Sequence, residues 1–218
     1  TFVGMGSEDI NAPVVLPGQS IRFTFHAGKG QALMFATMYG ASKDWFFAPE
    51  NPGLQLYNND GVPMTGDVSS QIKLWDNGTK AGMTDEKEDV GIMMVPDIDA
   101  SKLMKLELNY MASSSEFELT ITNTSGGSDN ETPFSPGVWA VSNVFNGELL
   151  NGMPFYEAGA KSNAEITAIA QMGDNSLLAE KISANTGIIT GISPAIVVVY
   201  TGDVNPIYEA GKKDAGIG

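Results

Sequence analysis

Two short segments hold the residues best suited to chemistry. Asp44 stands directly before Trp45, and Asp76 stands directly after Trp75. Each aspartate lies beside an aromatic residue at the end of a strand-like run, so we expect both carboxylates on loops above a buried hydrophobic layer. Carboxylates in such a position suit a cation site or a recognition surface at the rim of a β-sandwich. The pattern favours binding over catalysis.

Alternating hydrophobicity predicts the strands that must carry these loops. In the run 21–25, Ile21, Phe23 and Phe25 share one face, and polar residues occupy the other. We also expect strands over 33–39, which is mostly apolar, and over 72–75, 104–110 and 117–122. Strands at this spacing, with turn-forming residues between them, predict an antiparallel β-sandwich in which each sheet has one solvated face.

The pattern changes in the C-terminal half. Ser162 followed by Glu165 has the spacing of a capping box, and an apolar stripe after it is closed by Gly173. Asp174 or Asn175 could begin a second short helix that ends near residue 187. The predicted fold is therefore mainly β, an antiparallel β-sandwich with short helices in the C-terminal half.

A polar, glycine-rich connection over 125–130 suggests a boundary between a β-sandwich part, 1–124, and a second part, 131–218. The second part contains a repeat. Segment 134–141 is similar to 192–199, and segment 154–161 is similar to 206–213. We expect two strand-loop-helix units, 131–190 and 191–218, of which the second ends before its helix. The alternative is that both parts pack together as one permuted module.

Composition excludes several classes of function. The chain has 26 acidic and 12 basic residues and a formal net charge of −14, which repels nucleic acids and anionic membrane surfaces. It has no cysteine, so disulfides, thiolate metal sites and cysteine nucleophiles are excluded. No apolar run approaches the ~18 residues of a membrane span. We therefore expect neither a nucleic-acid partner nor a membrane span.

The residues also give little support for an enzyme. His26 is the only histidine, and one histidine without a matching motif makes neither a catalytic triad nor a zinc site. Two pairs of carboxylates, Asp60 with Asp67 and Asp97 with Asp99, could serve a glycosidase. Such pairs arise by chance in a chain with 26 acids. A hydrolase is thus our least favoured hypothesis.

Several motifs together resemble the spondin-type domain family, known from F-spondin and mindin in animals and from bacterial secreted proteins. Segment 42–47 resembles the family's Ser-Pro-Asp-Trp-Phe stretch, and segment 75–80 resembles its Trp-Asp-Ala-Gly-Thr-Asp stretch. Segments 134–136, 155–159 and 168–173 resemble its Ser-Pro segment, its aromatic turn and its helix end. In the animal module the helical part comes first, whereas here it comes second, which implies a permutation or an array of half-modules.

The resemblance implies a β-sandwich that acts in matrix or cell-surface adhesion with a bound calcium ion. The family's ligands correspond here to Asp44, Asp76 and Lys80, so a cation replaces the third carboxylate. A unit charge about 6 Å from a divalent ion repels it by roughly 5 kcal/mol at an effective dielectric constant of ~20. Either the Lys80 ammonium replaces calcium between the two aspartates, or Lys80 turns outward and calcium is retained.

The resemblance and the residues together predict a secreted, surface or periplasmic adhesion module, with its signal segment not included in this sequence. It would bind an extracellular protein or a glycan through the loops around Asp44, Trp45, Asp76 and Lys80, and would have no catalytic activity. The alternative function is a carbohydrate-binding module in which Trp45 and Trp75 stack on sugars. Both tryptophans could instead close the hydrophobic core.

Overall fold

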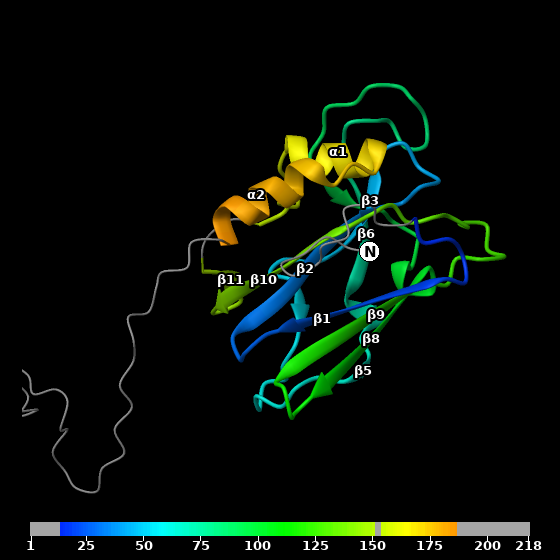
Figure 1. The fold of residues 1–218 in the computed structure, drawn as a ribbon. Helices are drawn as coiled ribbons and strands as arrows, with labels where there is room; N and C mark the ends of the chain where they lie inside the picture. The colour runs from blue at the N-terminus through cyan, green and yellow to red at the C-terminus, as the bar shows by residue number, and fades with distance from the viewer. Residues whose placement is uncertain (1–13, 151–153, 187–218) are drawn as a thin grey trace, which may run out of the picture. The chain divides into compact units, whose positions relative to one another are not determined.

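The computed structural model of the chain describes residues 14–150 and 154–186. Strands account for 39% and helices for 14%, and the antiparallel sheets curl into a half-barrel (Figure 1). Both α-helices lie in the C-terminal half of the chain. The predicted mainly β fold with antiparallel sheets and short C-terminal helices is therefore confirmed.

The smaller sheet has four strands. In spatial order they are β1 (Ser20–His26), β9 (Glu116–Asn123), β8 (Met104–Met111) and β5 (Gly66–Asp67). Burial alternates along β8 and β9, because successive side chains in a strand point to opposite faces. One face packs on the core and the other meets solvent. The strands predicted from alternation at 21–25, 104–110 and 117–122 are thus confirmed.

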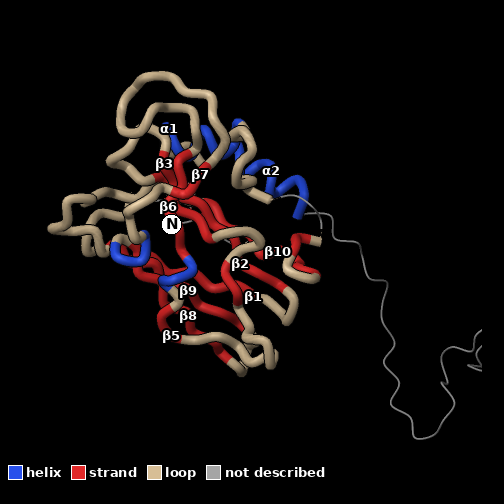
Figure 2. Tube along the Cα trace, turned by 180° about the vertical axis from the view of Figure 1, so that it is seen from behind, coloured by secondary structure: helices blue, strands red, loops and turns tan. Residues whose placement is uncertain are grey.

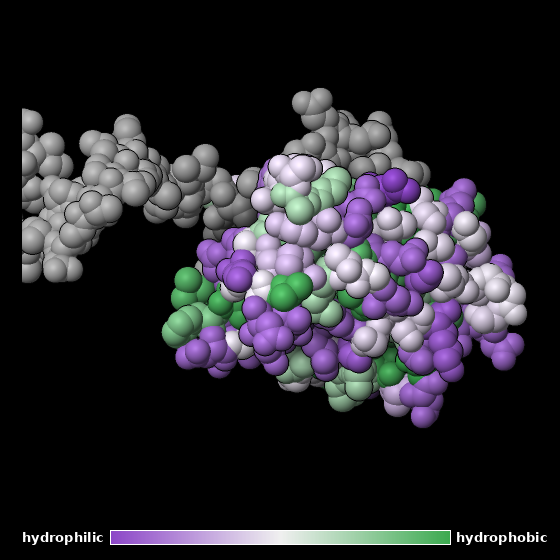
Figure 3. All heavy atoms as spheres, turned by 90° about the horizontal axis from the view of Figure 1, so that it is seen from below, coloured by the Kyte–Doolittle hydropathy of each residue, from purple (hydrophilic) through white to green (hydrophobic). Residues whose placement is uncertain are grey.

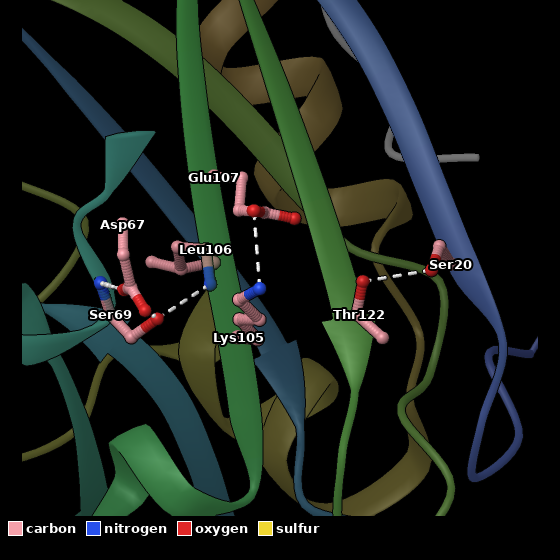
Figure 4. A network of polar contacts seen from close by, with 7 residues as sticks. All are labelled: Ser20, Asp67, Ser69, Lys105, Leu106, Glu107 and Thr122. Atoms are coloured by element: carbon pink, nitrogen blue, oxygen red, sulfur yellow. Dashed lines mark hydrogen bonds and ion pairs between the residues drawn. The ribbon is translucent and has the colours of Figure 1, made fainter. Parts of the chain in front are cut away.

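Polar contacts join neighbouring strands of this sheet (Figure 4). The hydroxyls of Ser20 and Thr122 lie 2.8 Å apart and join β1 to β9. The Ser69 hydroxyl accepts from the backbone N–H of Leu106 at 2.9 Å and donates to Asp67 at 2.5 Å. Ser69 begins the 3-10 helix η1 (Ser69–Gln71), so these bonds attach η1 and β5 to β8.

The larger sheet has seven strands and is covered on both faces. Its order is β11 (Glu148–Leu149), β10 (Val138–Phe145), β2 (Gln31–Met38), β3 (Trp45–Pro49), β6 (Ile72–Asp76) and β7 (Met93–Met94), and β4 (Leu54–Gln55) also pairs with β2. β2 is buried almost without interruption, as expected of a strand with two packed faces. The prediction of one solvated face per sheet is wrong for this sheet.

Two hydrophobic cores explain that burial. One lies between the sheets, and the other lies between the larger sheet and the helices. The first contains Phe35, Phe47, Leu74, Phe117 and Leu119 among others. The second contains Met34, Phe46, Trp75, Tyr156 and Ile166 among others. Neighbouring residues of β2, β3 and β6 belong to different cores, because their side chains point to opposite faces.

The helices begin and end close to their predicted positions. α1 (Ala164–Met172) is capped by Asn163, whose side chain accepts from the Ile166 N–H at 2.8 Å, so the cap lies one residue after the predicted Ser162. Gly173 ends α1 with a left-handed φ of 66°, as predicted. α2 (Ser176–Thr186) follows at once. None of the helices among the described residues is long and apolar enough to cross a membrane.

Residues on both sides of the 125–130 connection share one sheet. β10 pairs with β2 over six residues, with Trp139 opposite Phe35. Backbone hydrogen bonds also join Ile92 to Gly159 and to Ala160. The boundaries at 1–124 and 131–218 stay predictions. The second copy of the repeat, within 191–218, lies outside the described residues.

Candidate functional site

Three segments meet at the end of the larger sheet where β3 begins and β6 ends. They are the β2–β3 turn with Asp44, the β6–β7 loop from Asn77 onward, and the last turn of α1. The β6–β7 loop is the long tan loop beside α1 in Figure 2. Trp45 and Asp76 are paired residues of β3 and β6. The two predicted aspartates are thus brought to one place, which we call the Asp44 corner (Asp44, Asp76, Asn77, Thr79 and Gln171).

Asp44 is the most unusual residue of this corner because its side chain is wholly buried, with 0% exposure. Its Oδ2 accepts the Lys80 N–H at 2.7 Å and the Thr79 N–H at 2.9 Å, and it lies 3.1 Å from the Thr79 hydroxyl. Its Oδ1 has no hydrogen-bond partner among the residues that the structure describes. A buried carboxylate oxygen without a partner is costly, so this atom marks a place where a ligand could be held.

The charge state of Asp44 reflects its surroundings. Burial, and then the nearby charge of Asp76, raise the pKa of the Asp44 carboxyl above its usual range. The hydrogen bonds from Lys80 and Thr79 oppose that rise, because they stabilise the charged form. A positive ion beside Asp44 and Asp76 would stabilise the charged form of Asp44 and so oppose both causes of the raised pKa.

Asp76 shapes the loop that follows it. Its Oδ2 accepts from the Trp45 indole N–H at 2.9 Å, and its Oδ1 accepts from the Gly78 N–H at 2.8 Å. Gly78 has a φ of +74°, and a Cβ placed on it would lie 2.5 Å from the carbonyl oxygen of Val90. Only glycine fits here without strain. The glycine of the Trp-Asp-x-Gly-Thr motif is thus explained by close backbone approach.

Asn77, Thr79 and Gln171 complete the corner, and the sequence did not identify them as site residues. Asn77 Oδ1 accepts the Thr79 N–H at 3.0 Å and lies 2.6 Å from the Thr79 hydroxyl. The single hydroxyl proton can serve either Asn77 or Asp44, not both. Gln171 of α1 donates to the Thr79 hydroxyl at 2.6 Å. Asn77 and Thr79 lie inside segment 75–80, and the resemblance of that segment to the family's stretch was the signal that could have identified them.

Lys80 has two separate roles. Its backbone N–H binds Asp44, whereas its ammonium donates to the carbonyl oxygen of Asp85 at 3.3 Å. The Asp85 carboxylate pairs with Lys43 at 3.1 Å. The Lys80 ammonium therefore does not lie between Asp44 and Asp76, and the structure has the outward-turned arrangement of the two that were considered. Among the residues that the structure describes, neither Asp44 nor Asp76 then has an ion-pair partner.

The donor atoms at the corner fit a hard cation in chemical type. Asp44 Oδ1 is buried and unpaired, and the Asp76 charge lies close enough to raise the pKa of Asp44. Carboxylate, amide and carbonyl oxygens are the ligands that calcium prefers. Within residues 14–150 and 154–186, no group of three or more His, Cys, Asp or Glu side chains could hold a metal. A cation here would therefore rely on two carboxylates and on neutral oxygens.

The two predicted ligand-binding tryptophans lie in different surroundings. Trp75 is 5% exposed, donates to the Ala48 carbonyl at 3.1 Å and packs on Tyr156 with ring centres 4.9 Å apart. It belongs to the core and offers no open face to a sugar, so its predicted ligand-binding role is not supported. Trp45 is only partly buried and is held by Asp76.

Two of the other carboxylates considered in the sequence, Asp67 and Asp99, act in turns. Asp67 accepts from the backbone and hydroxyl of Ser69, and Asp99 accepts from both groups of Ser101. Hydrogen bonds from these serines are the largest cause that lowers the pKa of each aspartate. Both aspartates thus hold short 3-10 turns, η1 and η2 (Ala100–Lys102).

No family model matches the chain, and neither the curated proteins nor the solved structures contain a match.

Proposed function

We propose that this chain is a non-catalytic extracellular or cell-surface binding module of spondin type, which binds through loops at the rim of the sandwich. One observation carries the proposal. Asp44 and Asp76, the two aspartates that match the family's ligand positions, come together at one corner, and Asp44 keeps a buried oxygen without a partner. The Lys80 ammonium does not lie between them, because it binds the Asp85 carbonyl.

Calcium is the ion that we propose for this corner. Asp44 Oδ1 and the Asp76 carboxylate would hold it, with neutral oxygens of the same loops as further ligands. When bound, the ion would offset the repulsion between two carboxylates. It would also fasten the β2–β3 turn to the β6–β7 loop. Because both loops are continuous with the exposed rim, their fixed positions would preorganise the surface that meets the partner.

The partner is an extracellular protein or a glycan in this proposal. The exposed part of the β6–β7 loop carries several acidic residues, among them Asp85 and Asp89, which face Lys43 and Lys161. A carbohydrate-binding module is the alternative function. The burial of Trp75 removes one of its two sugar platforms, so Trp45 would have to act alone. The adhesion function is therefore the one that we favour.

A calcium titration monitored by melting temperature tests the proposal. An ion that binds only the folded chain stabilises it by about 2.7 kcal/mol at a hundred times its dissociation constant. We expect the melting temperature to rise with calcium in the native chain and not in Asp44→Asn. Asp85→Asn is the matched control, because it removes an exposed carboxylate from the neighbouring β6–β7 loop, and it should keep the calcium response.

Two results would count against the proposal. One is a melting temperature that millimolar calcium leaves unchanged, in which case water satisfies Asp44 Oδ1. The other is an equal response in Asp44→Asn. Binding to arrays of matrix proteins and glycans, with calcium and with a chelator, then tests the partner. A sugar signal that Trp45→Ala abolishes and the chelator leaves intact would favour the alternative function.

A further inference from the structure

A groove with polar and apolar lining lies at the opposite end of β3 and β6 from the Asp44 corner. Its volume is about 780 Å³, within the range of small-molecule sites. It is lined by residues from the β1–β2 turn, the start of β2, the segment after β3, β4 with the loop after it, η1, the start of β6, and the end of β10 with the turn after it. Viewed from below, the surface is mainly hydrophilic with separate hydrophobic patches (Figure 3).

Three charged side chains line the groove, namely Lys29, Lys73 and Glu50. None of them forms an ion pair with another residue in the part of the chain that the structure describes. Lys73 donates one hydrogen bond, to the Ser70 carbonyl at 3.2 Å, and has two further N–H donors. The three lining side chains thus sum to one net positive charge in a chain whose net charge is −14. The Lys73 charge also acts on Asp99 outside the groove, where it adds to the hydrogen bonds that lower the pKa of that carboxyl.

Three amide side chains in the groove are held at one end and open at the other. Gln55 donates to the Tyr57 carbonyl at 2.8 Å, which leaves its oxygen available. The side-chain oxygen of Gln71 accepts from the backbone N–H of Gln55 at 2.8 Å, which leaves the Gln71 NH₂ group available. Asn51 donates to the Tyr156 carbonyl at 2.8 Å, which leaves its side-chain oxygen available to a ligand. Anchored side chains lose little entropy when they bind a ligand, so these groups are preorganised.

The chemistry of these groups defines a ligand. The ammonium groups can only donate, an ionised Glu50 can only accept, and the open amide ends include both kinds. Hydroxyl groups both donate and accept, so a saccharide can satisfy Glu50 and the amides together. One carboxylate on that saccharide would neutralise the net positive charge. Apolar side chains, among them Pro52, Leu56 and Val144, also line the groove and could pack against the ring of the saccharide.

We propose that this groove binds a saccharide that carries a carboxylate, with Lys29 and Lys73 at the anion and with Glu50, Gln55 and Gln71 at the hydroxyls. The site does not depend on a cation at the Asp44 corner, since the two sites lie at opposite ends of the same strands. The inference therefore extends the proposed function and does not rest on it.

An NMR titration with two matched sugars tests the groove. Glucuronate and glucose share a ring and differ in a carboxylate against a hydroxymethyl group. We expect glucuronate to shift backbone amide signals of 29–32, 50–55 and 70–73, and glucose to bind about tenfold more weakly, since a charged hydrogen bond contributes about 1.5–3 kcal/mol. Sodium chloride should weaken glucuronate binding.

Variants separate the groove from general charge effects. Lys73→Gln should weaken glucuronate binding about tenfold. Lys105→Gln removes the same charge from β8, outside the groove, and should leave binding unchanged. Unshifted spectra elsewhere show that each variant is folded. Asp44→Asn in chelator should bind glucuronate normally, which separates this site from the calcium site.

Four outcomes would overturn the proposal. The first is that tens of millimolar glucuronate shift no groove amide, and the second is that glucose and glucuronate bind equally well. The third is an equal loss of binding in Lys73→Gln and Lys105→Gln. Shifts confined to residues around Asp44 and Trp45 would also overturn it, because they would assign sugar binding to the rim.

Discussion

The two ends of β3 and β6 carry similar residue types in opposite surroundings, one buried and one open to solvent. Asp44 precedes β3 and Glu50 follows it, so the same strand has a carboxylate at each end. The Asp44 carboxylate is wholly buried and accepts hydrogen bonds from its own loops. Glu50 lines an open groove and forms no ion pair within the described residues. One end is closed by its own backbone, and the other is open to solvent.

The difference shows how burial couples a polar site to stability. A buried polar group must find its partners inside the protein, and any loss appears in the free energy of unfolding. An exposed polar group exchanges water for ligand at little cost to the fold. Substitutions at the Asp44 corner should therefore affect stability and ion binding together. Substitutions in the groove should affect ligand binding alone.

The largest expected effect belongs to Asp44→Ala. It would leave the Lys80 N–H without its acceptor and remove one acceptor from Thr79. Unsatisfied buried donors cost about 1–3 kcal/mol each, so we expect a loss of about 3 kcal/mol in the free energy of unfolding. Urea denaturation measures it. Asp85→Ala, which removes an exposed carboxylate paired with Lys43, should stay within about 0.5 kcal/mol. A loss below 1 kcal/mol in Asp44→Ala would show that the corner is not tightly coupled to the fold.

A glycine pair measures how closely the corner is packed. Gly78 and Gly127 have nearly equal φ angles, +74° and +75°, but only Gly78 has backbone within reach of an added Cβ. We expect Gly127→Ala to cost about 1 kcal/mol from backbone strain alone. Gly78→Ala should cost about 2 kcal/mol, because Val90 must also move. If thermal or urea unfolding showed an equal loss of stability in the two variants, the β6–β7 loop would accommodate the added Cβ at no further cost in free energy.

The pH dependence of stability provides a third, smaller test of the buried end. Burial and the charge of Asp76 raise the pKa of Asp44 in the folded chain above the ordinary aspartate pKa of about 4. At pH values between these two pKa values, the folded chain binds more protons than the unfolded chain. Over that interval the contribution of Asp44 to the free energy of unfolding falls as pH rises, and Asp44→Asn should remove the fall. Urea unfolding of both proteins in chelator, from pH 4 to 8, measures the difference between them.

The difference between the two proteins is the quantity to examine, because other carboxylates act in the opposite direction. The pKa values of Asp67, Asp99, Glu165 and Asp174 are lowered, so their contributions to stability are lost as pH falls. They are common to both proteins and cancel in the comparison. A difference that does not change with pH would contradict the raised pKa of Asp44.

Sequence patterns could predict one sheet better than the other for a physical reason. β8 and β9 have one solvated face, so their burial alternates and their sequences show it. β3 is buried on both faces, so it has no alternation, and the solvated face expected for its sheet does not exist. The helices were predicted to within a residue or two, because caps and stripes are local signals.

The candidate sites differ in the same way. Asp44 and Asp76 could be found because a compact motif surrounds each of them. Gln171 could not, because its contact with Thr79 spans 92 residues and depends on where α1 lies. The groove has no local signature at all. Its amide and charged residues come from six separate segments and become neighbours only through the pairing of β2, β3, β4 and β6.

The smallest expected effect on stability is at the open end. Lys73 forms no ion pair within the described residues, and its one hydrogen bond is exposed, so Lys73→Gln should change the free energy of unfolding by no more than about 0.5 kcal/mol. Lys105→Gln, which breaks an exposed pair with Glu107, should behave in the same way. Urea denaturation of both variants beside Asp44→Ala makes the comparison. If Lys73→Gln lost stability on the scale of Asp44→Ala, the groove would be a structural contact, and the two ends of β3 and β6 would not differ in kind.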